Sequence, residues 1–297
     1  MITRVLAALV LLLALVPSGA RAELLWSRSF ESAALGGPMK YSVYLPSGYH
    51  DPRRDKELFP TVYLLHGVGD NERAWAAFGQ VEATMDRLIA SDEIPPFVIV
   101  MPAGKKSWFV DSADINGVGD YATAVRDDLR AHVEAAYRVI PERRGRFVAG
   151  LSMGGYGALR LGFERPDIYR AIGAMSSALW LRVTPDWVPS RPERLKRIFD
   201  GSFGEPFDPS RFVALHPRAY LDRLKAFDGP LGIYLMAGDD DRFGAHLSTV
   251  ELYRELRDRA IPAELRIVNG PHQWPTWRDG LAPMMGWFAG VMATDGG

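Results

Sequence analysis

The segment Gly150–Gly154 reads Gly-Leu-Ser-Met-Gly and places one serine between two glycines, each two residues away. A strand-like run, Arg146–Ala149, precedes it, and a helical pattern, Tyr156–Leu161, follows it. A serine in a tight turn between a strand and a helix projects its hydroxyl outward, and the flanking glycines have no Cβ to clash with the neighbouring backbone. Ser152 is therefore our candidate nucleophile for acyl transfer. The alternative is an ordinary glycine-rich turn.

A serine hydroxyl is a poor nucleophile unless a base, usually a histidine, removes its proton. His272 ends the loop Asn269-Gly270-Pro271-His272, directly after the last predicted strand, where a side chain can reach back over the edge of the sheet. His246 is the alternative, at the polar start of a predicted helix. We predict that His272 is the base.

The base needs a carboxylate to orient it, and in this architecture the chain order is serine, acid, histidine. Asp239, Asp240 and Asp241 follow the penultimate predicted strand. Asp241 stands three residues after Gly238, the usual offset for the acid in this loop, so we predict Asp241, with Asp240 as the alternative. We expect the remaining acids to form a solvated turn. The three do not match a calcium-binding loop.

An oxyanion intermediate needs two backbone N–H donors. The first is expected from Met153, directly after the nucleophile. The second is expected from the loop that follows Thr61–Leu65, where Val68 is our choice and Gly67 the alternative, and where His66 would hold the loop by a hydrogen bond. The glycines of this loop do not form a dinucleotide-binding pattern, because the third glycine position is occupied by Glu72.

Composition excludes several other chemistries. The 297 residues contain 35 Lys and Arg against 36 Asp and Glu, which gives no electrostatic reason to expect a nucleic-acid surface. The sequence has no cysteine, so disulfides, thiolate metal sites and cysteine nucleophiles are excluded. Acyl transfer by a serine, a histidine and an acid needs neither a metal nor an organic cofactor, and we expect none.

Residues 1–22 have the pattern of a signal peptide. Arg4 precedes an apolar run, Val5–Val16, and Ala20-Arg21-Ala22 fits a cleavage site with small residues. The run is shorter than the roughly 20 residues that span a bilayer. An uncleaved anchor is the alternative. We expect cleavage after Ala22, no stable membrane insertion afterwards, and a periplasmic or secreted protein.

Residues 23–297 are predicted to form one domain. Short β-branched or aromatic runs alternate with amphipathic stretches, which indicates an α/β sandwich with a mostly parallel sheet. Strands are expected at Leu24–Phe30, Met39–Leu45, Thr61–Leu65, Phe97–Met101, Phe147–Leu151, Ala171–Met175, Leu231–Met236 and Ala263–Val268, and helices at about 78–90, 119–137, 153–164, 244–260 and 277–292. Residues 181–230 are rich in proline and are expected to form an irregular excursion over one end of the sheet, with a partial lid as one reading of it.

The chain resembles the esterase D family, which includes S-formylglutathione hydrolases, feruloyl and acetyl esterases and mycolyl-transferring antigens. The matching segments span roughly residues 38–292 and are Tyr63–Gly67 with Trp75 downstream, Val98–Pro102, Trp108–Ser112, Ala149–Ala158 and Gly270–Trp274. The resemblance implies an α/β-hydrolase fold and a Ser152–His272–Asp241 triad with Val68 and Met153 as oxyanion donors. An export signal is unusual among the formylglutathione enzymes, and the mycolyltransferases differ more in the loop after the third strand.

Aromatic residues near the predicted site loops are candidates for substrate contact. We name Trp108, because the family often puts this loop at the rim of the site, and Trp274; packing is the alternative, especially for Trp277. The expected function is that of an exported serine carboxylesterase acting on small acyl or aryl esters. The alternatives are an acyltransferase with the same triad, a thioesterase similar to S-formylglutathione hydrolases, and a catalytically silent binding protein. The sequence does not indicate the oligomeric state.

Overall fold

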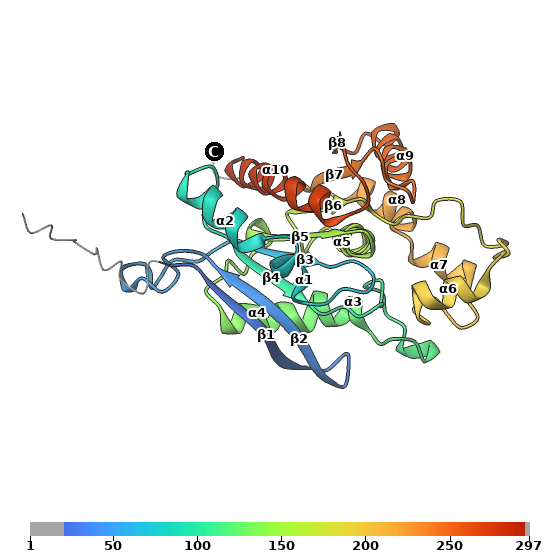
Figure 1. Ribbon diagram of the computed structural model, residues 1–297, viewed down its shortest axis with the longest axis horizontal. Coiled ribbons are helices and arrows are strands. Elements are labelled where there is room, and N and C mark those ends of the chain that lie inside the picture. The colour runs from blue at the N-terminus through green and yellow to red at the C-terminus, as the bar shows by residue number, and fades with distance from the viewer. Residues whose placement is uncertain (1–20, 295–297) are drawn as a thin grey trace, which may run out of the picture.

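The computed structural model describes residues 21–294, so the predicted signal segment, apart from Arg21 and Ala22, lies outside the described residues. Within them, eight strands form one sheet in the order β1-β2-β4-β3-β5-β6-β7-β8 (Figure 1). The strands are β1 (Glu23–Ser32), β2 (Gly37–Leu45), β3 (Thr61–Leu65), β4 (Val98–Pro102), β5 (Arg146–Leu151), β6 (Ala171–Met175), β7 (Gly232–Gly238) and β8 (Glu264–Val268). All eight predicted strands are present.

The sheet is antiparallel on the side formed by β1 and β2 and parallel elsewhere. β1 pairs with β2 as a hairpin, and β2 pairs antiparallel with β4. From β4 to β8 every neighbouring pair is parallel. The central strands β3, β4, β5 and β6 are buried along their whole length, as expected for parallel strands with helices on both faces. The carboxyl ends of the parallel strands therefore open at one edge.

Helices cover both faces. They are α1 (Ala74–Ala77), α2 (Val81–Ala90), α3 (Tyr121–Thr123), a π-helical segment (Ala124–Leu129), α4 (Arg130–Ala136), α5 (Met153–Glu164), α6 (Pro192–Phe199), α7 (Pro209–Leu215), α8 (Leu221–Ala226), α9 (Ala245–Asp258) and α10 (Trp274–Ala293). Short 3₁₀ turns lie at Pro52–Arg54, Ala113–Ile115, Arg143–Gly145 and Pro217–Tyr220. The long helix predicted at 119–137 is α3, the π-helical segment and α4 in direct succession.

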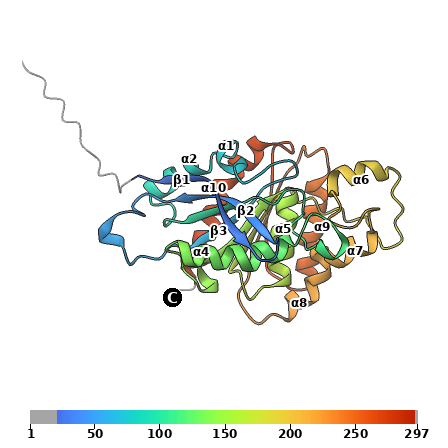
Figure 2. The same ribbon diagram turned by 90° about the horizontal axis from the view of Figure 1, so that it is seen from below.

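The alternation of side chains along the strands divides the core into two layers. In β3, Tyr63 and Leu65 belong to one layer, and Val62 and Leu64 belong to the other. The first layer packs against α4, α5, α8 and α9, and the second against α1, α2 and α10. Figure 2 shows α4 in front of the central strands of the sheet.

The segment 181–230 is less irregular than we predicted, because it contains α6, α7 and α8. Two of its prolines occupy the first turns of α6 and α7, where the missing N–H is not needed, and Asp208 caps α7 by accepting hydrogen bonds from the N–H groups of Ser210 and Arg211. These two prolines, which we interpreted as loop signals, therefore begin helices. Figure 1 places α6 and α7 at one end of the molecule, beyond the ends of the strands.

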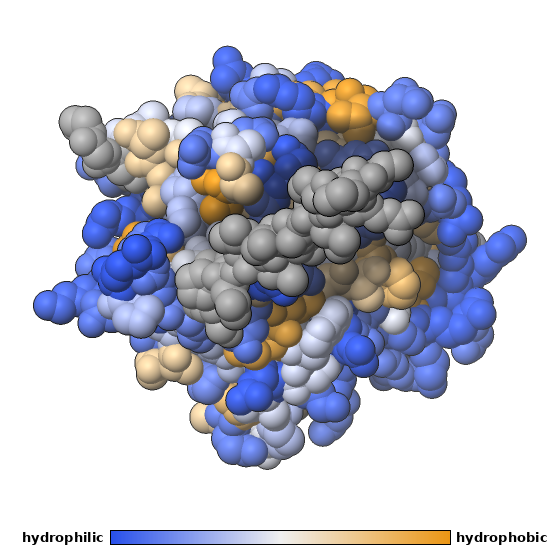
Figure 3. Space-filling model, turned by 60° about the vertical axis from the view of Figure 1, so that its left-hand side comes forward, coloured by the Kyte–Doolittle hydropathy of each residue, from blue (hydrophilic) through white to orange (hydrophobic). Residues whose placement is uncertain are grey.

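The surface is mostly polar on the face drawn in Figure 3, where hydrophobic areas are small and separate. None of the helices within residues 21–294 is long and apolar enough to cross a membrane.

Candidate active site

Ser152 stands at the junction of β5 and α5, as predicted. Its backbone has φ 53° and ψ −114°, a conformation that L-residues adopt rarely. The two flanking glycines make this turn possible: a Cβ on Gly150 would lie 2.5 Å from the carbonyl of Gly154, and a Cβ on Gly154 would lie 2.6 Å from the carbonyl oxygen of His66. Both contacts are too short for any side chain, which is the physical reason for the two glycines.

Hydrogen bonds to the backbone hold the strained turn. The Ser152 N–H donates to the carbonyl of Met175 at 2.9 Å, at the end of the neighbouring strand β6. The Ser152 carbonyl accepts from the N–H groups of Tyr156 at 3.0 Å and Ala178 at 3.2 Å. The position of the serine is therefore fixed by β6 as well as by its own helix.

His272 lies against Ser152, and Asp241 lies against His272. The distance from His272 Nε2 to Ser152 Oγ is 3.0 Å, and His272 Nδ1 lies 2.5 Å from Asp241 Oδ2. A carboxylate can only accept, so Nδ1 carries the proton and Nε2 is free to accept from the serine. The Asp241 side chain is fully buried and that of His272 is 11% exposed. These three residues come from loops after β5, β7 and β8, which meet at the carboxyl edge of the sheet.

Asp241 is held in its charged form. Burial by itself would raise the pKa of its carboxyl, but the hydrogen bond and charge of His272, together with the N–H groups of Phe243 and Ala245, lower this pKa overall. The Phe243 N–H donates to Oδ1 at 2.9 Å. Both carboxylate oxygens therefore have partners.

The other two acids of this loop behave differently from each other. Asp240 is exposed, so the structure brings Asp241 and not Asp240 to His272. The sequence predicts that Asp239 is a solvated acid, but its Oδ1 accepts a hydrogen bond from the Gly270 N–H at 3.0 Å. This bond ties the acid loop to the histidine loop. The alternative base, His246, lies at the start of α9, and its contacts include no hydrogen bond to Ser152.

The loop after β3 lies beside Ser152. A Cβ on Gly67 would lie 3.6 Å from Ser152 Cβ. His66 fixes this loop, because its Nδ1 donates to the Gly67 carbonyl and its Nε2 accepts from the Gly104 N–H, both at 2.8 Å. Burial lowers the pKa of His66 to about 4, so its ring is neutral near pH 7. Val68 follows as a 38% exposed residue, and Met153 is buried at the first position of α5.

The structure buries Trp108, whose contact with substrate stays a prediction. Its side chain is 1% exposed, its Nε1 donates to the carbonyl of Ile198 at 3.1 Å, and its ring packs 4.7 Å from that of Phe199. The partners come from α6, about 90 residues further along the chain, so this burial could not be inferred from the loop alone.

Trp274 lies near His272 among other rings. Its ring centroid is 5.3 Å from Trp75, 5.5 Å from Trp277 and 5.7 Å from Phe78. Trp277 is buried and lies 5.0 Å from the His272 ring, which agrees with its packing interpretation.

Two exposed phenylalanines near the site were missed by the sequence analysis. Phe243 is 58% exposed, and its ring centroid lies 4.9 Å from that of His272. Phe78 is 56% exposed and contacts Trp274. The available signal for Phe243 was an aromatic residue two positions after the acid, in an otherwise polar turn. We call Phe78, Phe243 and Trp274, with the His272 ring, the aromatic rim.

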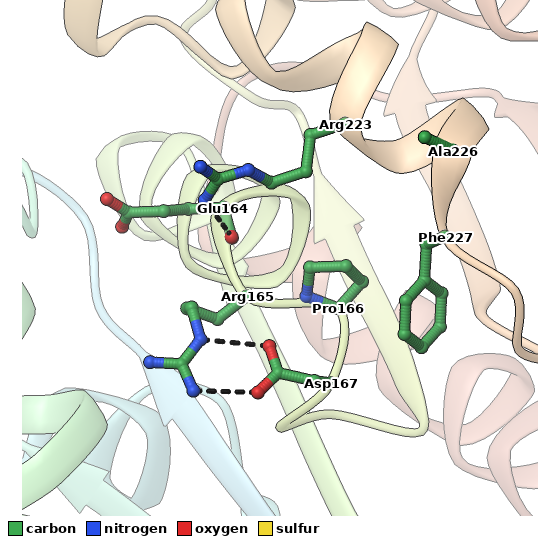
Figure 4. A pocket seen from close by; sticks show the side chains of 7 residues that line it. All are labelled: Glu164, Arg165, Pro166, Asp167, Arg223, Ala226 and Phe227. Atoms are coloured by element: carbon green, nitrogen blue, oxygen red, sulfur yellow. Dashed lines mark hydrogen bonds and ion pairs between the residues drawn. The ribbon is translucent and has the colours of Figure 1, made fainter.

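A surface pocket elsewhere in the molecule has a different character (Figure 4). It lies between the C-terminal end of α5 and α8, at the opposite end of α5 from Ser152. Its lining includes the Arg165–Asp167 ion pair and Arg223, whose Nη1 donates to the Glu164 carbonyl at 2.9 Å. Its charged groups are thus engaged with each other, and it contains none of the predicted site residues.

No group of three or more histidine, aspartate or glutamate side chains in residues 21–294 is arranged to hold a metal ion.

The chain is similar to several known proteins. A family model described as "Putative esterase" matches residues 32–288. An endo-1,4-beta-xylanase/feruloyl esterase of Xylanibacter ruminicola is 31% identical over 175 residues, which is 58% of this chain but only 24% of that protein. An acetyl esterase of Caldicellulosiruptor saccharolyticus is 25% identical over 245 residues, 80% of this chain and 86% of the relative.

Among solved structures, a ferulic acid esterase superposes with a TM-score of 0.73 at 26% identity, over 92% of this chain and 99% of the other. The mostly parallel sheet between helical layers and this similarity confirm the predicted α/β-hydrolase fold.

Proposed function

This chain belongs to the "Putative esterase" family, and from that premise we propose that it is an exported serine carboxylesterase that hydrolyses small acyl or aryl esters. The observation that carries the proposal is the continuous hydrogen-bonded series from Ser152 through His272 to Asp241. The related feruloyl and acetyl esterases support an ester substrate. The leader pattern in residues 1–22 supports export to the periplasm or beyond.

In the proposed first step, His272 Nε2 takes the proton of Ser152 while Oγ attacks the ester carbonyl carbon. Asp241 keeps the imidazole in the required tautomer and stabilises its charged form. The N–H groups of Met153 and Val68 donate to the tetrahedral oxyanion, and one such donor is worth roughly 3–4 kcal/mol in other serine hydrolases. The C–O bond to the alcohol breaks, and the alcohol leaves with the proton from His272.

In the second step, water attacks the acyl group on Ser152. His272 takes one proton from this water, the tetrahedral species collapses, and the carboxylic acid leaves as Ser152 Oγ regains a proton. No step requires a metal or an organic cofactor. If an added alcohol captured the acyl group faster than water, the same residues would perform acyl transfer.

The experiment measures hydrolysis of p-nitrophenyl acetate, butyrate, octanoate and ferulate by the protein recovered from the periplasm or medium, with Glu23 expected at its N-terminus. We expect Ser152→Ala to reduce kcat/KM by at least about 10³-fold, because the nucleophile is lost. Turnover in the variant equal to that of the wild type would contradict the proposed nucleophile. Failure of the wild type on every ester would contradict the esterase.

The acid loop offers a matched pair of controls in the same assay. Asp241→Asn is expected to reduce kcat by about 10²–10⁴-fold, because an amide favours the wrong tautomer of His272. Asp240→Asn removes the same charge one residue earlier, from an exposed side chain, and is expected to leave kcat within about threefold of the wild type. Equal losses in both variants would contradict the specific role of Asp241.

A further inference from the structure

One carboxylate beside Ser152 has no part in the proposed mechanism. Asp70 lies in the loop after β3, and its N–H donates to the Gly67 carbonyl at 3.2 Å, so the chain turns back on itself. Gly69, with φ +88°, permits this turn. A Cβ on Gly67 would lie 3.6 Å from Asp70 Oδ2 and also 3.6 Å from Ser152 Cβ. The carboxylate and the nucleophile thus border the same side of Gly67.

The neighbours of Asp70 in this loop are all engaged elsewhere. Glu72 is buried and accepts a hydrogen bond of 2.7 Å from Ser27 Oγ. Arg73 lies over the ring of Trp26, with its Cζ 5.0 Å from the ring centroid. Asn71 Oδ1 accepts from the Arg73 N–H at 2.9 Å. Glu72 and Arg73 therefore tie the loop to β1, and neither neutralises Asp70.

The Asp70 side chain, by contrast, has neither a hydrogen bond nor an ion pair with any residue between 21 and 294. It is half-buried, and burial raises the pKa of its carboxyl to about 6, so the group is ionised at pH 8. A half-buried carboxylate without a protein partner depends on water for its hydrogen bonds, and it stands beside a nucleophile whose reaction develops negative charge. The charge of Asp70 disfavours that step unless a bound group offsets it. A donor supplied by the bound ester would be such a group.

We propose that Asp70 is a specificity-determining residue whose carboxylate accepts a hydrogen bond from a hydroxyl or ammonium group of the bound ester and repels esters that carry a carboxylate. The inference rests on the proposed esterase function and goes beyond it by naming the polar chemistry of the substrate. Charge complementarity of this kind selects among substrates more than it raises affinity in general.

The test compares esters that differ in charge on either side of the scissile bond. In one series the acyl group varies: 4-nitrophenyl hexanoate, 6-aminohexanoate and hemiadipate, whose chains are too long to displace nitrophenolate by closing a five-membered ring. In the other the alcohol varies: butyrate esters of ethanol, choline and glycolate, where choline tests charge alone because its quaternary ammonium has no N–H to donate. The kcat/KM values of wild type and Asp70→Asn are measured at pH 8. We expect the ratio of cationic to anionic ester to fall about tenfold in the variant in at least one series, with neutral esters changed less than about threefold.

Two variants control this experiment. Asp240→Asn removes an exposed negative charge from the acid loop and is expected to leave both ratios unchanged. Asp70→Ser provides a second substitution that can still form the turn if Asp70→Asn folds poorly. An active enzyme whose ratios are the same with and without the Asp70 carboxylate would overturn this inference alone. A wild type inactive on all six esters would contradict the proposed function and, with it, this inference.

Discussion

Two regions of the molecule contain a histidine among aromatic rings, and they differ in exposure. In the aromatic rim, the His272 ring packs against Phe243, which faces solvent. In the second region, which we call the buried aromatic cluster, Trp108 and Tyr156 pack against four residues of the 181–230 segment, namely Phe199, Phe203, Phe212 and His216. Residue types are therefore similar in both, although only the rim contains the histidine that contacts Ser152 Oγ.

The hydrogen-bond partners of the two histidines explain the difference. His216 Nε2 donates to the Leu179 carbonyl at 2.6 Å, and its Nδ1 accepts from the Arg218 N–H at 3.0 Å. Both partners are backbone groups, and burial lowers the pKa of His216 to about 4. His272 instead contacts a carboxylate and a hydroxyl. A ring between backbone groups stabilises the fold, whereas a ring between Asp241 and Ser152 can move a proton.

The largest expected effect lies in the buried aromatic cluster. Trp108→Ala should lower the free energy of unfolding by about 3–5 kcal/mol, because it leaves a cavity among packed rings. Urea denaturation measures this loss, and kcat/KM per folded molecule should stay within about threefold of the wild type. Trp26→Ala, at a 41% exposed position, is the control and should change stability by less than about 1 kcal/mol. If Trp108→Ala left the stability unchanged and raised KM tenfold, Trp108 would instead be a substrate-binding residue.

A smaller effect is expected from acid. The folded protein keeps His216 neutral, with a pKa of about 4 against 6.5 for an ordinary histidine. The unfolded chain therefore binds more protons between these values, and the stability contributed by neutral His216 is lost as pH falls from about 6.5 to 4. The loss amounts to about 2–3 kcal/mol by linkage. In His216→Gln the decline in unfolding free energy between pH 7 and pH 4 should be shallower by that amount; an equally steep decline would contradict the assignment.

The smallest effect is expected at the rim. Phe243→Ala should leave stability within about 1 kcal/mol, because the side chain is mostly exposed, and should lower kcat/KM for an aryl ester by about three- to tenfold through the lost ring contact. Leu247→Ala, at a 65% exposed apolar residue four positions further on, is the matched control. If Phe243→Ala destabilised the fold as strongly as Trp108→Ala, the distinction between an exposed rim and a buried cluster would be contradicted.

The fold was largely predictable because its signals are local. Each strand is a short apolar run, and α2, α5, α9 and α10 follow helical spacing, so all eight strands and these helices were expected close to where they lie. The predictions of an esterase family and of an enzyme acting on ester bonds are confirmed by the family match and the related esterases. The 181–230 segment was predicted less well, because a proline can either break a helix or begin one.

The residues of the candidate site also differ in how far the sequence alone could identify them. Ser152 was identifiable because its strand, its turn and its helix are contiguous in the sequence. The choice of Asp241 over Asp240 depended on which carboxylate the turn after β7 aims at His272, and the burial of Trp108 depended on α6. The offset of Asp241 from Gly238 already favoured Asp241 in the sequence, whereas no count of positions could reveal the burial of Trp108. The unpartnered carboxylate of Asp70 likewise emerged only from its contacts.

The sequence by itself determined the order of elements and the candidates for the nucleophile and its histidine, since these follow from periodicity, glycine spacing and chain order within segments of about ten residues. The tertiary structure alone decided which aromatic rings face solvent and which carboxylate is left without a partner. These outcomes depend on side chains from loops that are 30 to 120 residues apart in the chain, and they are set where parallel strands bring those loops to one edge of the sheet.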